Sequence, residues 1–294
     1  MEILKSYDLF PGTSLSYVKS GEAPCRCCHT AQNTILEINY CQSGRIGWKM
    51  SDGSSIYLGP GDFSVHTRAL CENSLMTFPN GRYSGICIVA DIGKFDSAPP
   101  EYIKEAGITL KSVCETYCGG EKFTTFTGNE VTKGIFSSFY DVPERLKTAY
   151  LKLKLTELIL YLEKERGTKF KEPNRYKSDQ VEIIKQIHDK LTGDLSMRIT
   201  IEELSRQYLM NTSTIKQLFK AVYGNSIAAH IKEHRMEKAA QLLLTTEDSI
   251  SAVAASVGYE SQSKFTQEFK KQYQMLPKEY RKIHTYESTV LKDM

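Results

Sequence analysis

Two stretches of the sequence follow the same plan and decide how the second half of the chain folds. They read ITIEELSRQYLMNTSTIKQLFK (199–220) and SISAVAASVGYESQSKFTQEFK (249–270). In each stretch, apolar residues recur at helical spacing on both sides of a short break in the pattern. The sequence therefore predicts two copies of a short helix, a tight turn and a second helix.

Capping residues mark where these predicted helices begin. Thr200 and Glu203 form the pattern of a capping box. Asn211 and Ser261 are suited to cap the two second helices, because their side chains accept hydrogen bonds from unpaired backbone N–H groups. Gly258 allows a tight turn in the second copy, whereas the first copy has no glycine in its turn.

The second helix of each copy has a polar outer face. It carries hydroxyls, amides and lysines: Ser213, Lys216, Gln217 and Lys220 in one helix, and Gln262, Ser263, Lys264, Gln267 and Lys270 in the other. Amides and lysines reach base edges in the major groove, and serines and lysines hold phosphates. For one helix an ordinary solvated face is a sufficient explanation, but its repetition favours contact with double-stranded DNA.

The segment between the two copies, and the charge of this half, fit the same prediction. A helix expected over 226–244 is about 28 Å long at 1.5 Å per residue. This length approaches the ~34 Å of one DNA turn, so the two second helices can reach successive major grooves.

Residues 175–284 hold 17 Lys and Arg against 13 Asp and Glu, a net charge of +4, whereas residues 1–174 are neutral. The excess favours an anionic partner.

Residues 181–282 resemble the DNA-binding domain of the AraC/XylS family of bacterial transcription regulators. The resemblance rests on Arg235-Met236, Ala239, Leu242-Leu243, Ile250, Val253-Ala254, Val257-Gly258-Tyr259, Phe265, Phe269-Lys270 and Pro277. The chain departs from the family at Ile227, where proline is usual, and at Gln274 and Leu276, where glycine is usual before the late proline. The resemblance implies base contacts by Ser213, Lys216, Gln217, Gln262, Ser263 and Gln267, and phosphate contacts by Lys220, Lys264 and Lys270. It gives Arg235 a structural role.

The first half of the sequence reads as strands followed by helices. Short runs rich in β-formers, such as 35–40 and 85–90, alternate with turns from about residue 13 to 92, which predicts an antiparallel sandwich or barrel. Helical patterns follow, the longest over 143–165. We therefore expect an α+β chain: an N-terminal cupin-like antiparallel β-barrel with dimerisation helices over 1–170, a linker over 171–178, and an all-α domain with two helix-turn-helix units over 179–294.

The family resemblance implies that the first domain binds a small-molecule effector in its barrel. The turn Gly59-Pro60-Gly61-Asp62 is similar to a turn common in such barrels. A small barrel holds one small ligand, and residues that can line it are Tyr40, Trp48, Tyr57, His66 and Arg82. A place in the core or on the surface is the alternative for each of them, and the sequence does not identify the ligand.

A leucine seam in the longest helix of the first half has two explanations. Leu151, Leu155, Leu158 and Leu162 recur at intervals of three and four residues, which places them on one face of a helix. The helix either packs on its own barrel or forms the interface of a homodimer, and spacing alone does not separate the two.

All eight cysteines lie in the first 118 residues and suggest a second kind of sensor. Cys25-Arg26-Cys27-Cys28-His29 contains a CxxC motif, and Cys114 and Cys118 form a CxxxC pair. Cys25, Cys28, His29, Cys114 and Cys118 are suitable ligands for zinc or a soft metal, and neighbouring thiols can form a redox disulfide. This alternative describes a metal- or redox-responsive regulator.

Composition and missing motifs exclude other classes of protein. No run of 18 apolar residues suggests a membrane helix, and MEILKSYDLF lacks the apolar core of a signal peptide, so we expect a cytoplasmic protein with no membrane partner. The absence of Ser/His/Asp and HExxH patterns predicts a protein that is not an enzyme and requires no cofactor. A DNA-repair methyl-acceptor module needs two well-separated CxxC-like pairs, and this sequence has no second CxxC. A protein-interaction module that does not bind DNA is a further alternative. The combined prediction is an effector-controlled, dimeric transcription regulator, an activator that works with RNA polymerase.

Overall fold

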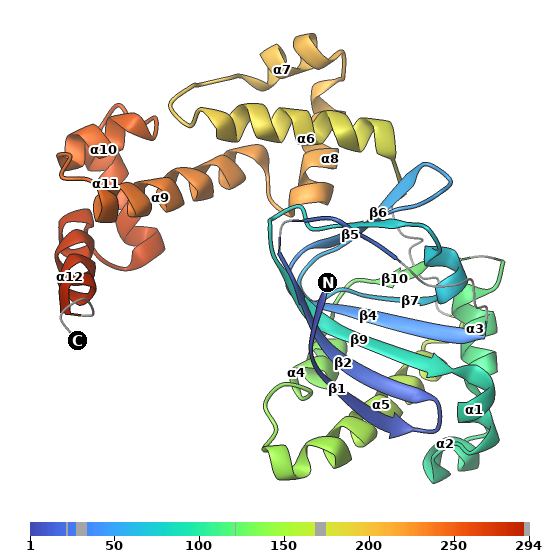
Figure 1. Ribbon diagram of the computed structural model, residues 1–294. Helices are drawn as coiled ribbons and strands as arrows, with labels where there is room; N and C mark the ends of the chain where they lie inside the picture. The colour runs from blue at the N-terminus through green and yellow to red at the C-terminus, as the bar shows by residue number, and fades with distance from the viewer. Residues whose placement is uncertain (22, 28–33, 121, 168–174, 291–294) are drawn as a thin grey trace. The chain divides into compact units, whose positions relative to one another are not determined.

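The computed structural model describes residues 1–21, 23–27, 34–120, 122–167 and 175–290 (Figure 1). The chain forms two compact units, Met1–Asp179 and Gln180–Met294. No helix in these described ranges is both long enough and apolar enough to cross a membrane.

Two antiparallel sheets form the first unit. Six strands pair in the order β1-β2-β9-β4-β7-β10 and five in the order β11-β6-β5-β8-β3. Their bounds are β1 Glu2–Phe10, β2 Thr13–Ser20, β3 Cys25–Arg26, β4 Ile35–Gly44, β5 Ile46–Lys49, β6 Ser54–Leu58, β7 Phe63–Thr67, β8 Leu75–Thr77, β9 Tyr83–Asp91, β10 Thr124–Phe126 and β11 Tyr176–Lys177. The strand-rich, cupin-like fold is confirmed, although strand pairing among the described residues gives two sheets rather than one closed barrel.

Buried side chains of the two sheets meet in one apolar cluster. Trp48 and Ile56 of the five-stranded sheet belong to the same buried cluster as Val18 and Cys87 of the six-stranded sheet, and Phe123 joins them. Alternation along each strand sends the other side chains of the six-stranded sheet to its opposite face, where a second buried cluster forms. The six-stranded sheet is therefore apolar on both faces.

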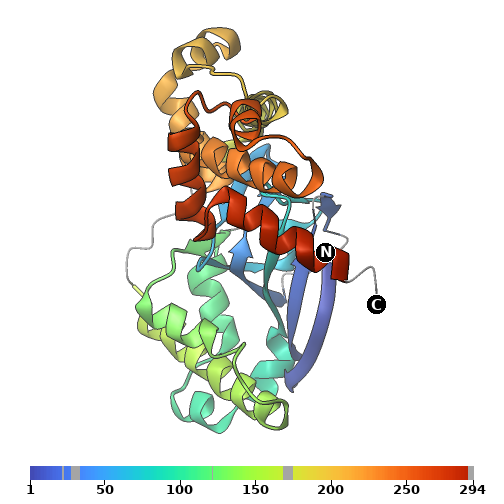
Figure 2. The same ribbon diagram turned by 90° about the vertical axis from the view of Figure 1, so that its left-hand side faces the viewer.

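Helices cover that opposite face of the six-stranded sheet (Figures 1 and 2). They are α1 Ile92–Ser97, α2 Glu101–Glu105, α3 Leu110–Cys118, α4 Glu130–Ser137 and α5 Lys147–Lys164, with 3-10 turns η1 Arg68–Cys71 and η2 Glu144–Leu146. The leucine seam of α5 packs into this core: each leucine is at most 2% exposed, at Leu151, Leu155, Leu158 and Leu162. The assignment of this seam to a dimer interface is therefore corrected, because its side chains are buried in the core between α5 and the chain's own six-stranded sheet.

The end of the expected linker pairs with a sheet of the first unit. Part of the range 171–178 lies outside the described residues, but Tyr176 and Lys177 form β11 and pair antiparallel with β6. The hydroxyls of Ser55 and Ser178 are hydrogen-bonded at 2.9 Å. Arg175 Nη1 donates to Asp52 Oδ2 at 2.9 Å. Backbone pairing therefore holds the chain to the first unit until α6 begins at Ser178.

The second unit is helical and contains both predicted helix-turn-helix units. Its helices are α6 Ser178–Gly193, α7 Ile201–Tyr208, α8 Thr212–Tyr223, α9 Ile227–Thr245, α10 Ile250–Ser256, α11 Gln262–Tyr273 and α12 Pro277–Val290. The pairs α7–α8 and α10–α11 are the two units, and α9 connects them (Figure 1). The all-α prediction for this half is confirmed.

The predicted caps hold the starts of these helices. Thr200 and Glu203 form a complete capping box at α7. Asn211 Oδ1 accepts from the backbone N–H of Thr214 at 2.8 Å, and Ser261 Oγ accepts from that of Lys264 at 3.4 Å. Local sequence therefore fixes where the first helix of one copy and the second helices of both copies begin.

Candidate nucleic-acid interface

The second helices, α8 and α11, carry the predicted DNA-contacting residues on their outer faces. Phe219 and Phe269 are fully buried at matching places and fix the rotation of each helix. Every predicted contact residue is exposed: Ser213, Lys216, Gln217, Lys220, Gln262, Ser263, Lys264, Gln267 and Lys270. The arrangement presents amides and lysines at the same phase on both helices.

Hydrogen bonding separates Ser213 from the other predicted base-reading residues. The Ser213 hydroxyl donates to Asn211 Oδ1 at 2.7 Å. The same oxygen also caps α8 by accepting from the backbone N–H of Thr214. Ser213 therefore helps to build the start of the helix, and a contact with DNA by this hydroxyl has to keep or replace that bond.

Glu268 is a carboxylate on α11 whose charge is compensated. Its oxygens lie 3.0 Å from Lys232 Nζ and 2.8 Å from Lys271 Nζ. These two ammonium groups lower the pKa of Glu268, so the carboxylate stays ionised and paired at neutral pH. The pairs partly cancel the repulsion that a free carboxylate on this helix would exert on phosphates.

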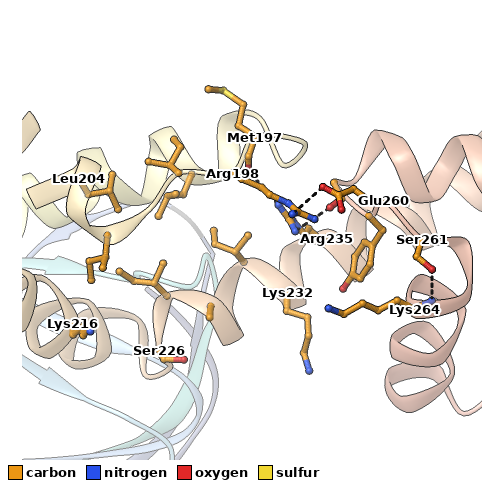
Figure 3. A pocket seen from close by; sticks show the side chains of 18 residues that line it. Met197, Arg198, Leu204, Lys216, Ser226, Lys232, Arg235, Glu260, Ser261 and Lys264 are labelled. Atoms are coloured by element: carbon orange, nitrogen blue, oxygen red, sulfur yellow. Dashed lines mark hydrogen bonds and ion pairs between the residues drawn. The ribbon is translucent and has the colours of Figure 1, made fainter.

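A groove of about 820 Å³ lies between the two helix-turn-helix units (Figure 3). Lys216 of α8 lies at one end and Lys264 of α11 at the other, and Lys232 of α9 lies between them. Apolar residues of α7 and α9, including Leu204 and Ile231, form part of the wall. Arg198 and Glu260, which pair at 3.0 Å, also line the groove. The groove therefore joins the lysines of both second helices across a surface of the second unit.

Arg235 connects the two helix-turn-helix units from its position on α9. Its Nη2 donates to the carbonyl of Met197 at 3.2 Å, and its Nη1 donates to the carbonyl of Gly258 at 3.4 Å. The guanidinium also lies 6.0 Å from the centre of the Tyr259 ring. These contacts link the loop before α7 to the turn of the second copy, consistent with the structural role implied by the resemblance.

The structure brings together only two of the five residues expected to bind an effector. Trp48 and His66 are buried between the sheets with their rings 6.2 Å apart, and His66 stacks on Phe123 at 4.2 Å. Trp48 also contacts Phe123, with ring centres 5.2 Å apart. The two residues therefore lie together on Phe123, within the buried interior of the first unit.

The other three expected effector-binding residues lie elsewhere. Tyr40 stacks on Phe136 at 4.1 Å, on the helix-covered face of the six-stranded sheet. Tyr57 is half-buried and Arg82 is exposed. The prediction that all five line one site is wrong, because β4 alternation directs Tyr40 away from the space between the sheets.

A pocket of about 750 Å³ in the first unit was not anticipated from the sequence. It opens beside α3 and the β5–β6 loop. Its lining includes Thr34, Met50, Asp52, Thr67, Lys111, Cys114, Cys118 and Arg175. These residues come from loops, from α3 and from the end of β7, and no spacing rule in the sequence predicts that they meet.

The cysteines divide between separate places. Cys25 lies on β3, and Cys114 and Cys118 lie one turn apart on α3. Cys28 and His29 fall outside the described residues. Within the described residues, the groups of three or more side chains close enough to share a metal ion include no cysteine. The structure therefore does not assemble the described members of the proposed thiol site.

Comparisons with known proteins identify the second unit and then most of the chain. A family model for a helix-turn-helix domain matches residues 204–283. The transcriptional regulator AlkR of Acinetobacter baylyi is 38% identical over 82 residues, which cover 28% of this chain and 27% of AlkR, so this match spans about a quarter of that relative. The virulence regulon transcriptional activator VirF of Yersinia enterocolitica serotype O:8 is 31% identical over 250 residues, which cover 81% of this chain and 86% of VirF.

Solved structures of ToxT from Vibrio cholerae match nearly the whole chain. The structure with a bound unsaturated fatty acid is 15% identical, with 96% of each chain covered and a TM-score of 0.37. The family assignment rests instead on the long match to VirF and on the helix-turn-helix domain. This chain belongs to the AraC family of DNA-binding transcription regulators.

Proposed function

We propose that the chain is a sequence-specific activator that places α8 and α11 in successive major grooves of one DNA site. The observation that carries this proposal is the repeated exposed face of amides and lysines on the two helices. Gln217, Gln262 and Gln267 are assigned to base edges, and Lys220 and Lys270 to phosphates. VirF, a relative with a long match, is named a transcriptional activator, which supports the sign of regulation.

Selection of binding sites from random DNA tests this proposal. The expected product is a site with two conserved segments about one helical turn apart. Binding should weaken steeply with salt, because lysine contacts to phosphates release counterions. A selection that yields no shared sequence would refute sequence-specific binding. Transcription from a promoter carrying the selected site, with and without the protein, then separates an activator from a repressor and tests the need for RNA polymerase.

The small-molecule effector is assigned to the 750 Å³ pocket beside α3. The pocket combines apolar walls at Met50 and Leu70 with polar groups at Lys111 and Thr67. Pockets of this size and mixture hold small organic ligands. The test is ligand screening by thermal shift, repeated with Cys114→Trp, which places a large side chain in the pocket. Ligands that stabilise both proteins equally would place the effector site elsewhere.

A homodimer is assigned to the outer face of η2 and α5, opposite the buried leucine seam. Leu146, Tyr150, Leu153 and Leu160 are between 39% and 60% exposed, and the three leucines recur every seven residues. This heptad spacing is typical of a seam that pairs with a second copy of itself. Together these assignments describe a cytoplasmic, non-enzymatic regulator that responds to a ligand and acts on DNA.

A further inference from the structure

Three histidines of the second unit converge where α6 meets α9. His188 comes from α6, and His230 and His234 come from successive turns of α9. One ring nitrogen from each lies within 4.8 Å of those of the other two. The Nε2 atoms of His230 and His234 are 3.0 Å apart, close to the ~3.3 Å between ligands of a tetrahedral zinc ion with bonds of about 2.0 Å.

Carboxylates behind two of the rings fit the same geometry. His188 Nδ1 lies 3.0 Å from Asp189 Oδ1, and His234 Nδ1 lies 3.9 Å from Glu237 Oε2. At His188 the carboxylate is within hydrogen-bond distance, so it can hold the proton on Nδ1 and leave the Nε2 lone pair free for a metal. At His234 the 3.9 Å separation is too long for a hydrogen bond, and Glu237 contributes only a nearby negative charge. This second layer of polar groups is characteristic of histidine metal sites.

Burial and ring packing surround two of the three histidines. His230 is 4% exposed, and its ring is packed among His188, Tyr223 and Phe219. Burial lowers the pKa of His230 to about 4 and also lowers the pKa of His188. Neutral imidazole is the form that binds metal ions. A neutral, hydrogen-bonded aromatic cluster is the alternative explanation for the same residues.

We propose that His188, His230 and His234 bind one divalent transition-metal ion with the preferences of zinc, with water as the fourth ligand. Three imidazoles suit Zn²⁺, Co²⁺, Ni²⁺ or Cu²⁺, whereas Mg²⁺ and Ca²⁺ prefer oxygen ligands. The ion links α6 to α9 beside Tyr223, the last residue of α8, whose ring stacks on His188 at 4.3 Å. Metal binding therefore stabilises the packing of α6 and α9 against α8, the second helix of the first helix-turn-helix unit.

The first experiment is titration of the full chain, purified without a histidine tag and under reducing conditions, with Co²⁺. Three imidazoles and a water give the visible absorption of tetrahedral Co²⁺ without the thiolate-to-metal charge-transfer band that cysteine ligands produce. This difference matters because the first unit contains several free thiols. We expect saturation of the thiolate-free signal at one ion per chain. Its absence, with the protein folded by circular dichroism, overturns the proposal.

Variants test whether the three named residues hold the ion. His188→Gln and His234→Gln are each expected to weaken the thiolate-free Co²⁺ signal at least tenfold and to abolish the rise in melting temperature produced by Zn²⁺. Lys238→Gln, on an exposed part of α9, is the matched control and should behave as the parent protein. Unchanged metal binding in both histidine variants overturns the site. Two histidine positions are used so that a folding defect in one leaves the other informative.

Discussion

Leu209 and Gly258 occupy matching places in the turns of the two helix-turn-helix units, and both have left-handed backbone angles. Their φ values are 49° and 81°. Leu209 is 93% exposed, so its side chain contacts little. A Cβ on Gly258 would lie 2.6 Å from the carbonyl oxygen of Leu195 and 2.7 Å from Arg235 Nη2. The two copies share a turn, but only the second is crowded enough to require glycine.

Gly258→Ala is expected to destabilise the protein by at least about 2 kcal/mol. A left-handed conformation costs a residue with a Cβ roughly 1–2 kcal/mol, and the close carbonyl adds strain. The measurement is the free energy of unfolding from urea denaturation of the full chain. A loss below about 0.5 kcal/mol would mean that the turn relaxes, and that Arg235 does not hold it tightly.

Leu209→Gly is expected to change the free energy of unfolding in the opposite direction and to stabilise the protein by up to about 1 kcal/mol. Glycine removes the left-handed strain, and the greater freedom of glycine in the unfolded chain offsets about 0.5–1 kcal/mol of that gain. The same urea experiment measures it. Leu209→Asn is the matched control, because asparagine tolerates this conformation while keeping a side chain. Destabilisation by both variants would show that the leucine side chain has a contact role.

Gln217→Ala is expected to weaken binding to the selected DNA site by about 1–3 kcal/mol, with the loss confined to one base position. Gln217 is exposed on α8 between the buried Ile215 and Phe219. Lys220→Ala, one helical turn away, should weaken binding to all sequences alike and reduce the salt dependence by about one ion. Fluorescence anisotropy with base-substituted sites measures both. Equal losses on selected and random DNA would remove the base-reading role of Gln217.

Local sequence patterns were sufficient to predict the second unit, because its helices are defined by short-range signals. The capping box at Thr200 and the cap at Asn211 act within three residues, and helical spacing places Phe219 and Phe269 inward. The histidine cluster was missed although His230 and His234 are one turn apart on α9. Its third member, His188, is brought in by tertiary packing of α6, which no local pattern encodes.

The first unit was harder to predict because its strands bury both faces. Tyr40 and Trp48 are both in strands, but their side chains belong to different buried clusters. The 750 Å³ pocket forms instead from loops, from α3 and from the end of β7. The leucine seam of α5 had the correct spacing for either a core or a dimer. Tertiary packing decides which face of α5 contacts the sheet, and the face that does so is the one with the four buried leucines.

Leu153→Glu is expected to convert the proposed dimer to a monomer with little change in the stability of the fold. Leu153 is 60% exposed on α5, so a charge there disturbs only a partner copy. Leu155→Ala is the contrasting variant: Leu155 is 2% exposed, and its truncation should cost about 2–5 kcal/mol of folding stability. Analytical ultracentrifugation and urea denaturation measure the two effects. A parent protein that is monomeric at all concentrations would exclude the interface.

Cys114 is expected to react with iodoacetamide faster than the buried thiols of the first unit. It is half-buried in the 750 Å³ pocket, and a hydrogen bond from Cys118 lowers its pKa, which raises its thiolate fraction near neutral pH. Burial raises the pKa of Cys41 to about 12, so Cys41 provides the internal reference in the same digest. Mass spectrometry of the two peptides over time measures the ratio of rates, and we expect at least tenfold.

Two further measurements test whether the Cys118 hydrogen bond and the pocket set the reactivity of Cys114. Cys118→Ala removes the hydrogen-bond donor and should slow labelling of Cys114, while leaving Cys41 unchanged. A ligand that occupies the pocket should protect Cys114 from the reagent in proportion to its binding. If saturating ligand stabilises the protein but labelling of Cys114 proceeds at its original rate, the effector binds outside this pocket. If Cys118→Ala does not slow labelling, the access of reagent to the pocket, rather than the thiolate fraction, sets the reactivity of Cys114.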